Sequence, residues 1–189
     1  MRCQLGGEHI AYSARLRLQS ARWSDALSSL QLSRDEAAQH WLGWTPDEAR
    51  RDLALLGHDP LLISSSCLSF VGFDVHTDRI IASITLNRIA ADTHDIGAVV
   101  EPTARGQGYG REALATVSRI AHQHFGIAAL RAGCESTNVV SRRWLESCGF
   151  VRVDGPTEHT LPNGRVADTL WWHHADPTAK RRCRSPLTA

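Results

Sequence analysis

Apolar and polar residues follow two different periodicities along the chain, and their order predicts a mixed α/β fold. Residues 67–75 and 80–90 are rich in β-branched and aromatic side chains and flank the turn sequence HTDR, which predicts a hairpin of two central strands. Residues 111–126 instead carry apolar side chains at helical spacing, from Ala113 to Phe125, and Gly126 follows where a helix would end. The chain therefore combines strand patterns with helix patterns.

The other segments extend this arrangement toward both ends of the chain. We expect further strands over residues 14–21, 94–102, 127–135, 150–161 and 165–174, the last two joined as a hairpin through Pro162, Asn163 and Gly164. We expect helices that begin near Ser24, that run from Thr45 to Gly57, and that carry Val140, Trp144 and Cys148 on one face before Gly149. The fold class is α/β (α+β), with a mixed sheet of about six or seven strands. Residues 1–176 form one domain, and residues 177–189 form a basic tail that we expect to be flexible.

Composition excludes several classes of protein. A formal net charge of +1 gives no global field that would attract nucleic acid or anionic lipid. No run of residues approaches the ~18 consecutive apolar positions of a membrane span, and the first residues lack the apolar region of a signal peptide. The five cysteines are odd in number and widely spaced, which indicates reduced thiols. We expect a cytoplasmic protein, a monomer or a homodimer, that has no membrane partner.

Two local features suggest other ligands, but each has a simpler interpretation. The basic run KRRCR over residues 180–184 could touch nucleic acid, yet no aromatic platform accompanies it, so a solvated tail is favoured. His122 and His124 are two apart in a predicted helix, and the adjacent His173 and His174 would point to opposite faces of a strand. Neither pair converges on one ion, so we expect no metal site.

The segment EPTARGQGYGREA, residues 101–113, lies between a predicted strand and a predicted helix and carries glycines at alternate positions. A loop that opens a helix points its backbone amides at an anion, and Arg105 could add a charged contact to a phosphate. The ATP-binding P-loop requires Lys-Ser/Thr after its last glycine, where this chain has Arg111-Glu112. The dinucleotide fingerprint G-x-G-x-x-G does not match the observed spacing either. A tight turn with no ligand is the alternative interpretation.

The loop resembles the acetyl-CoA loop of the GCN5-related N-acetyltransferases (GNAT), which reads Arg/Gln-x-x-Gly-x-Gly/Ala and which Arg105, Gly108 and Gly110 match. A second segment, Asn138-x-x-Ser141 followed by Gly149-Phe150, is similar to the stretch after the fifth strand of that family. Residues 15–26, RLRLQSARWSDA, and the sequence WLGW are similar to the subgroup that acetylates ribosomal-protein N-termini and certain antibiotics. The resemblance implies the GNAT fold, with helices on both faces of the sheet and two strands splayed around the cofactor.

The resemblance also implies an activity and a cofactor. It implies an enzyme that transfers the acetyl group of acetyl-CoA to a primary amine, on a protein N-terminus or a small molecule such as an antibiotic, by direct attack in a ternary complex. The pantetheine arm would pair with backbone groups of the strand before the loop, and the pyrophosphate would lie on the loop amides. The cofactor-binding residues would then be Ala98, Val99, Val100, Arg105, Gly106, Gln107, Gly108, Tyr109, Gly110, Asn138 and Ser141.

The catalytic residues follow the family pattern less closely. Asp95 occupies the position of the family's usual catalytic Glu and would act as a base through a water. Asp168 and Glu101 are weaker candidates for the base. The backbone N–H near Val99 could stabilise the oxyanion. Where the family has a tyrosine as proton donor this chain has Leu145, and Ser141 is the candidate to replace it.

The acceptor side is least defined by sequence. Trp41 and Trp44 belong to WLGW, which we expect to lie between helices as part of the acceptor wall, and Asp168 could also contact substrate. Core packing is the alternative for at least half of the six tryptophans. Because the family's tyrosine is missing and its Glu is replaced, an acyl-CoA-binding regulatory module without turnover remains the alternative to an enzyme.

Overall fold

The computed structural model describes residues 2–3, 8–29, 34–43, 47, 51, 54, 61–180 and 183. Its strands are β1 (Arg2–Cys3), β2 (His9–Tyr12), β3 (Leu16–Ser20), β4 (Cys67–Asp74), β5 (Ile80–Ala90), β6 (Thr93–Val100), β7 (Ala129–Glu135), β8 (Val151–Val153), β9 (Glu158–Thr160) and β10 (Val166–Ala175). Its helices are α1 (Trp23–Ser29), α2 (Glu36–Leu42), the 3₁₀ turn η2 (Pro102–Ala104), α4 (Tyr109–Ile120), the π-helical turn η3 (Ala121–Phe125) and α5 (Val139–Ser147). Among the described residues, no helix combines the length and the apolar character that are required to cross a bilayer.

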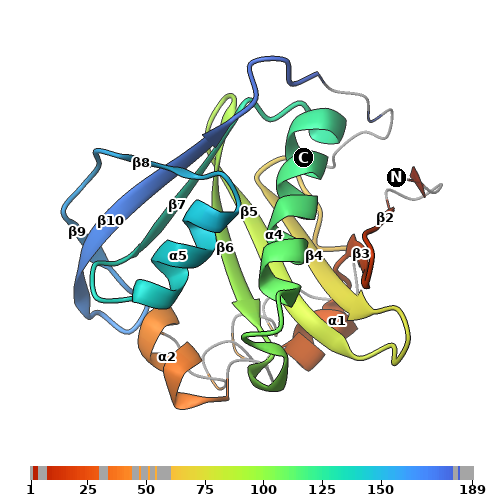
Figure 1. The fold of residues 1–189 in the computed structure, drawn as a ribbon, viewed down its shortest axis with the longest axis horizontal. Helices are drawn as coiled ribbons and strands as arrows, with labels where there is room; N and C mark the ends of the chain where they lie inside the picture. The colour runs from red at the N-terminus through yellow and green to blue at the C-terminus, as the bar shows by residue number, and fades with distance from the viewer. Residues whose placement is uncertain are drawn as a thin grey trace.

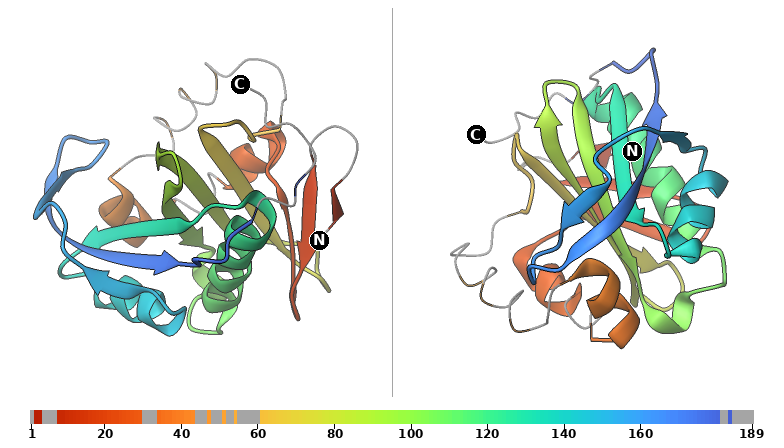
Figure 2. Two further views of the ribbon diagram at one scale, coloured as in Figure 1. Left: turned by 90° about the horizontal axis from the view of Figure 1, so that it is seen from above. Right: turned by 90° about the vertical axis from the view of Figure 1, so that its left-hand side faces the viewer.

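The strands form one mixed sheet in the order β1-β2-β3-β4-β5-β6-β7-β10-β8, with β9 paired to β10 (Figure 1). All neighbours are antiparallel except β6 and β7, which are parallel. Helices α4 and α5 cover one face of the sheet, and α1 and α2 lie on the other (Figure 2). The predicted α/β class with helices on both faces is confirmed.

The described sheet has ten strands, more than the six or seven that the sequence predicts. Two of the additional strands, β1 and β2, are short pieces before the first predicted strand. The segment 150–161, predicted as one strand, is divided into β8 and β9 because Trp171 packs between them. A Cβ at Gly155 would lie 2.4 Å from Cδ1 of Trp171, and Trp171 Nε1 donates a hydrogen bond to the Pro156 carbonyl at 2.7 Å.

Helix α2 is absent from the prediction, which placed WLGW between helices. Asp35 caps its N-terminus by accepting a hydrogen bond from the Ala38 amide, and Gly43 ends it in the left-handed conformation at φ 68°. These are the usual start and stop signals of a helix. Of the helix expected from Thr45 to Gly57, only Asp47, Arg51 and Ala54 are described, all helical, and the rest lies outside the described residues.

The main core lies between the sheet and α4, and one residue of the expected tail belongs to it. The core includes Leu114 and Val117 of α4, Leu86 of β5 and Leu130 of β7. Cys183 also belongs to it, is 7% exposed, and donates its backbone N–H to the His124 carbonyl at 3.0 Å. The expectation of a wholly solvated tail is therefore wrong at Cys183, since an apolar thiol gains from burial against the core.

Candidate active site

Strands β6 and β7 separate partway along their length and leave a wedge in the sheet. They pair only over Thr93–Asp95 and Ala129–Arg131. Beyond that point β6 continues beside β5 as far as Val100, and β7 continues beside β10 as far as Glu135. The splayed pair expected from the resemblance is therefore present, and its unpaired edges face each other across the wedge (Figure 1).

The register of β6 decides which of its backbone groups face the wedge. The Glu101 amide donates to the Ile81 carbonyl of the neighbouring strand at 2.8 Å. Backbone groups of alternate residues point to the same side of a strand, so the amide of Val99 also faces β5, whereas those of Ala98 and Val100 face the wedge. The oxyanion donor predicted at Val99 therefore points the wrong way, and Ala98 and Val100 have the required orientation.

The glycine loop after β6 leads into the N-terminus of α4. Gly106 and Gly108 have φ of 75° and 82°, in the left-handed region that favours glycine, and Gly108 is the N-cap. The Glu112 amide donates to the Gly108 carbonyl at 3.1 Å, the first bond of the helix. The amides of Tyr109, Gly110 and Arg111 therefore have no intrahelical acceptor and form an anion-binding end.

The side chains of the loop turn toward the protein, away from any ligand on those amides. The Tyr109 hydroxyl donates to Asp74 at 2.6 Å, which raises the pKa of the tyrosine and, together with two backbone amides, lowers the pKa of the carboxyl. Arg15 stacks on the Tyr109 ring at 4.2 Å, pairs with Glu112 at 2.8 Å and donates to the Gln107 carbonyl at 3.0 Å. The loop is thereby held from both ends.

Arg105 joins the loop to α2. Its Nε donates to the Val100 carbonyl at 2.9 Å, and its two terminal nitrogens form a bidentate pair with Asp35 at 2.7 and 2.8 Å. This hydrogen bonding to Arg105 lowers the pKa of Asp35. The phosphate contact predicted for Arg105 is replaced by an ion pair, so in this structure the arginine positions the loop.

The other end of α2 is attached to the opposite side of the wedge. Arg165, which immediately precedes β10, donates to the His40 carbonyl of α2 at 2.7 Å and pairs with Glu135 of β7 at 2.6 Å. Helix α2 therefore spans the open end of the wedge, and Trp41 lies on it, half-buried beside His40. Trp44 lies outside the described residues.

Asp95, the predicted base, lies at the closed end of the wedge in the last paired register of β6 and β7. Both carboxylate oxygens accept from Arg131, at 2.7 Å from Nε and 2.9 Å from Nη2. The guanidinium also lies over the Trp171 ring at 4.3 Å. Both oxygens of the predicted base are therefore already engaged by the arginine.

The two weaker candidates for the base lie elsewhere. Glu101 follows β6, accepts a hydrogen bond from Thr103 and is 4.0 Å from Arg79. Asp168 is exposed on β10, opposite Glu158 of β9. Neither is on the unpaired edge of the wedge.

Helix α5 brings Asn138 and Ser141 toward the loop helix. Asn138 is buried and caps α5 by accepting from the Ser141 amide at 3.0 Å, so its carbonyl oxygen has a structural partner. Trp144, one turn after Ser141, is close to α4: a Cβ at Gly110 would be 3.3 Å from its ring. Residues three apart share a helix face, so Ser141 faces the same side as Trp144.

The sequence did not single out Cys134, although it lies on the unpaired part of β7. Burial raises the pKa of this thiol to about 11, only partly opposed by Arg142 and Arg152. The thiol is therefore protonated at neutral pH and is a poor nucleophile. Its position follows from the β7 register, which no sequence pattern reveals.

The chain matches known acetyltransferases in sequence and in structure. Residues 15–151 match the family model described as the acetyltransferase (GNAT) domain. No curated protein matches the sequence at a significant level. Solved structures that resemble it include an acetyltransferase of the GNAT family from Bacillus anthracis, with a TM-score of 0.73 and 16% identity over 88% of this chain and 98% of that one.

Two further similar structures contain coenzyme A. RimL, a ribosomal L7/L12 alpha-N-protein acetyltransferase, has a TM-score of 0.72 and 18% identity over 90% of this chain and 99% of that one. Spermidine N-acetyltransferase from Vibrio cholerae, in complex with CoA and spermine, has a TM-score of 0.71 and 17% identity over 86% and 96%. The family match covers most of the chain and includes the loop and most of the wedge. The chain therefore belongs to the GNAT family of acetyl-CoA-dependent N-acetyltransferases.

Proposed function

We propose that this enzyme acetylates a primary amine by direct attack on acetyl-CoA bound in the wedge, with the N-terminus of a peptide as the acceptor. One observation carries the proposal: the unpaired edge of β6 leads directly into a loop whose amides at Tyr109, Gly110 and Arg111 have no intrahelical acceptor. An extended pantetheine can add to such an edge as a strand does, while the pyrophosphate occupies the helix end.

The reaction forms an N–C bond and breaks the C–S bond of the thioester. The neutral amine attacks the carbonyl carbon, and the wedge-facing amide of Ala98 or Val100 donates to the oxyanion. Collapse of the intermediate expels the coenzyme A thiolate, the nitrogen loses a proton, and the sulfur gains one. A protonated Cys134, with its pKa near 11, is unsuited to an acetyl-enzyme intermediate, which favours one ternary complex.

Proton transfers are assigned to weakly acting groups. Asp95 is paired with Arg131 and is proposed only to orient a water or the amine. The acceptor amine therefore enters as the free base or loses its proton to solvent. Ser141 is the proposed proton donor to the leaving sulfur because it faces α4 from the first turn of α5. Since thiols have a reference pKa near 8.5, solvent can substitute for this hydroxyl at modest cost.

The charges around the wedge favour a peptide acceptor over a polyamine. Three carboxylates around the wedge are Asp35, Asp95 and Glu135, and each pairs with an arginine at 2.6 to 2.7 Å. A polycation requires uncompensated carboxylates along its length. Among the similar proteins, RimL modifies a protein N-terminus, and the proposal places this chain with the subgroup that acts on ribosomal proteins.

A thiol-release assay tests this proposal. Purified protein with acetyl-CoA is given equal concentrations of peptides with different N-termini, spermidine and an aminoglycoside, and free coenzyme A is measured. Turnover with at least one peptide, and less with the polyamine, is expected. A preference for spermidine would contradict the peptide assignment, and tight coenzyme A binding without turnover on any acceptor would contradict the whole proposal in favour of a regulatory module.

A further inference from the structure

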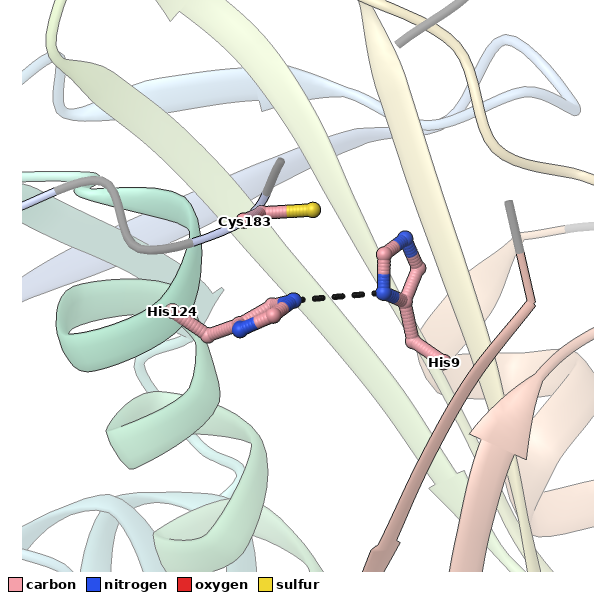
Figure 3. A group of neighbouring side chains, drawn as sticks. All are labelled: His9, His124 and Cys183. Atoms are coloured by element: carbon pink, nitrogen blue, oxygen red, sulfur yellow. Dashed lines mark hydrogen bonds between the residues drawn. The ribbon is translucent and has the colours of Figure 1, made fainter. Parts of the chain in front are cut away.

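Three side chains from distant parts of the chain converge at the end of α4 farthest from the loop. His9 belongs to β2, His124 to η3, and Cys183 to the C-terminal segment. One ligand atom from each lies within 4.8 Å of the others (Figure 3). Figure 3 shows the thiol of Cys183 and the ring of His124 directed toward the ring of His9. These three residues are far apart in sequence, so the spacing of neighbouring histidines does not reveal the group.

The two histidine rings have a spacing that suits a shared metal ion. His124 Nε2 and His9 Nδ1 share a hydrogen bond of 3.2 Å (Figure 3), which a bound ion would replace. Two imidazole nitrogens bound to one tetrahedral zinc ion at 2.0–2.1 Å would be separated by about 3.3 Å. The rings therefore need little movement to bind an ion, and the thiol needs a shift of about 1 Å.

The surroundings of His9 leave a polar atom without a partner. His9 is 1% exposed, and its Nε2 has no hydrogen-bond partner among the residues that the structure describes. Its ring packs edge-on against Phe125 at 4.9 Å, and its backbone amide donates to Ser20. With an ion on Nδ1, the proton of the neutral ring lies on Nε2, so this nitrogen is not the ligand atom.

We propose that His9, His124 and Cys183 bind a zinc ion that fastens the N-terminal strands and the C-terminal segment to the end of α4. Two imidazoles and a thiolate are typical zinc ligands, and a water would complete the tetrahedral site.

The proposed site is separate from the acetyl-CoA wedge. His124 follows the loop end of α4 by some fifteen residues, a helical path of about 20 Å. His124 itself lies in η3, a π-helical turn, and such a local irregularity often accompanies a binding site. Zinc therefore stabilises the fold and takes no part in acetyl transfer, so the proposal is independent of the acceptor.

Metal analysis of the full-length protein without an affinity tag tests the inference. The protein is stripped with a chelator, dialysed against zinc, and its bound metal is measured by mass spectrometry. Bound zinc is expected at one ion per chain, with a thermal midpoint several degrees above that of the stripped protein. Cobalt substitution should give the intense visible bands of a tetrahedral site and a near-ultraviolet thiolate-to-cobalt band.

Matched variants separate this site from adventitious binding. His124→Ala and Cys183→Ser should each lower zinc content at least tenfold, and Cys183→Ser should weaken the thiolate band. Exposed His76→Ala and partly buried Cys67→Ser are the controls and should retain one ion. Less than a tenth of an ion per chain after reloading, an octahedral cobalt spectrum, or full zinc retention by both ligand variants would overturn the proposal.

Discussion

Arg105 and Asp35, 70 positions apart in sequence, form a bidentate ion pair that joins the glycine loop to α2. The same carboxylate caps α2 through the Ala38 amide, so one side chain fixes a helix end and one side of the wedge. Arg165 fixes the other end of α2 to β7 and β10. The position of α2 beside the open end of the wedge therefore depends on two arginines that lie outside the helix.

Substitution of Asp35 separates its two roles. Asp35→Asn keeps an oxygen for the Ala38 amide and weakens the ion pair, whereas Asp35→Ala removes both contacts. An exposed pair contributes about 0.2–1 kcal/mol and a helix cap about 0.5–2 kcal/mol, so the alanine variant should be the less stable in urea. Both variants should raise the acceptor KM more than they lower kcat. Equal stability of the two variants would contradict the capping role.

The pKa of Asp35 gives the first variant a pH signature. Its folded pKa lies below the usual value, so the stabilisation is present above the unfolded pKa and is lost as pH falls through the folded pKa. The urea midpoints of wild type and Asp35→Asn should therefore converge in acid.

A bulky residue at Gly108 should block the cofactor. Gly108→Val forces a branched side chain to φ 82° at the N-cap and crowds Arg15, whose Nη2 would be 3.4 Å from the new Cβ. The dissociation constant for coenzyme A, measured by calorimetry, should rise at least tenfold. Gly164→Val is the matched control, because Gly164 has the same φ in the turn between β9 and β10, outside the glycine loop, with nothing within 4 Å of a Cβ. Unchanged coenzyme A binding by Gly108→Val would remove the loop from the binding site.

Cys134→Ala tests the absence of a covalent intermediate. With a pKa near 11 the thiol is not an effective nucleophile at pH 7, so the variant should keep kcat within a few-fold of wild type. Initial-rate patterns for both proteins should intersect, as expected for a ternary complex. Parallel lines for wild type and inactivity of Cys134→Ala would instead establish an acetyl-cysteine.

His94 should make the protein sensitive to mild acid. It is buried on β6 beside the wedge, and burial, together with Arg88, lowers its pKa below the reference value of 6.5. The unfolded chain binds a proton there before the folded chain does, so the free energy of unfolding falls as pH drops below 6.5, by at most about 1.4 kcal/mol per pH unit. His94→Gln should make the free energy of unfolding depend less steeply on pH. The measurement is urea unfolding of zinc-loaded protein from pH 7 to pH 5. His76→Gln, on an exposed turn, controls for the substitution itself.

The sequence predicted the parts of the site that depend on local chain chemistry. The glycines of the loop and the helix after it are both fixed by residues close in sequence. The wedge itself was expected only from the resemblance, because a strand pattern does not show where two parallel strands stop pairing. Whether the Val99 amide faces β5 or the wedge likewise depends on the register between β6 and β5. A register shift of one residue would reverse this direction and leave the composition of both strands unchanged.

The errors share a physical origin in long-range pairing of polar groups. Arg105 and Asp95 were interpreted as free charges, but each has a partner, Asp35 or Arg131, on a segment that the topology brings beside it. Burial of Cys183 could not be foreseen either, since a basic flank is typical of a solvated tail. In each case the fold supplies a neighbour that local sequence cannot identify.

Two truncations test the packing of that last cysteine. Removal of residues 178–189 eliminates Cys183, its bond to the His124 carbonyl and its burial against the core, whereas removal of residues 184–189 retains all three. Loss of a small buried side chain and one hydrogen bond costs about 1–3 kcal/mol, so the shorter chain should melt several degrees lower in the presence of a chelator. Because the wedge lies at the other end of α4, kcat well below the melting range should be the same for both truncations. A large loss of kcat in the shorter chain alone would mean that the C-terminal segment acts on the wedge itself.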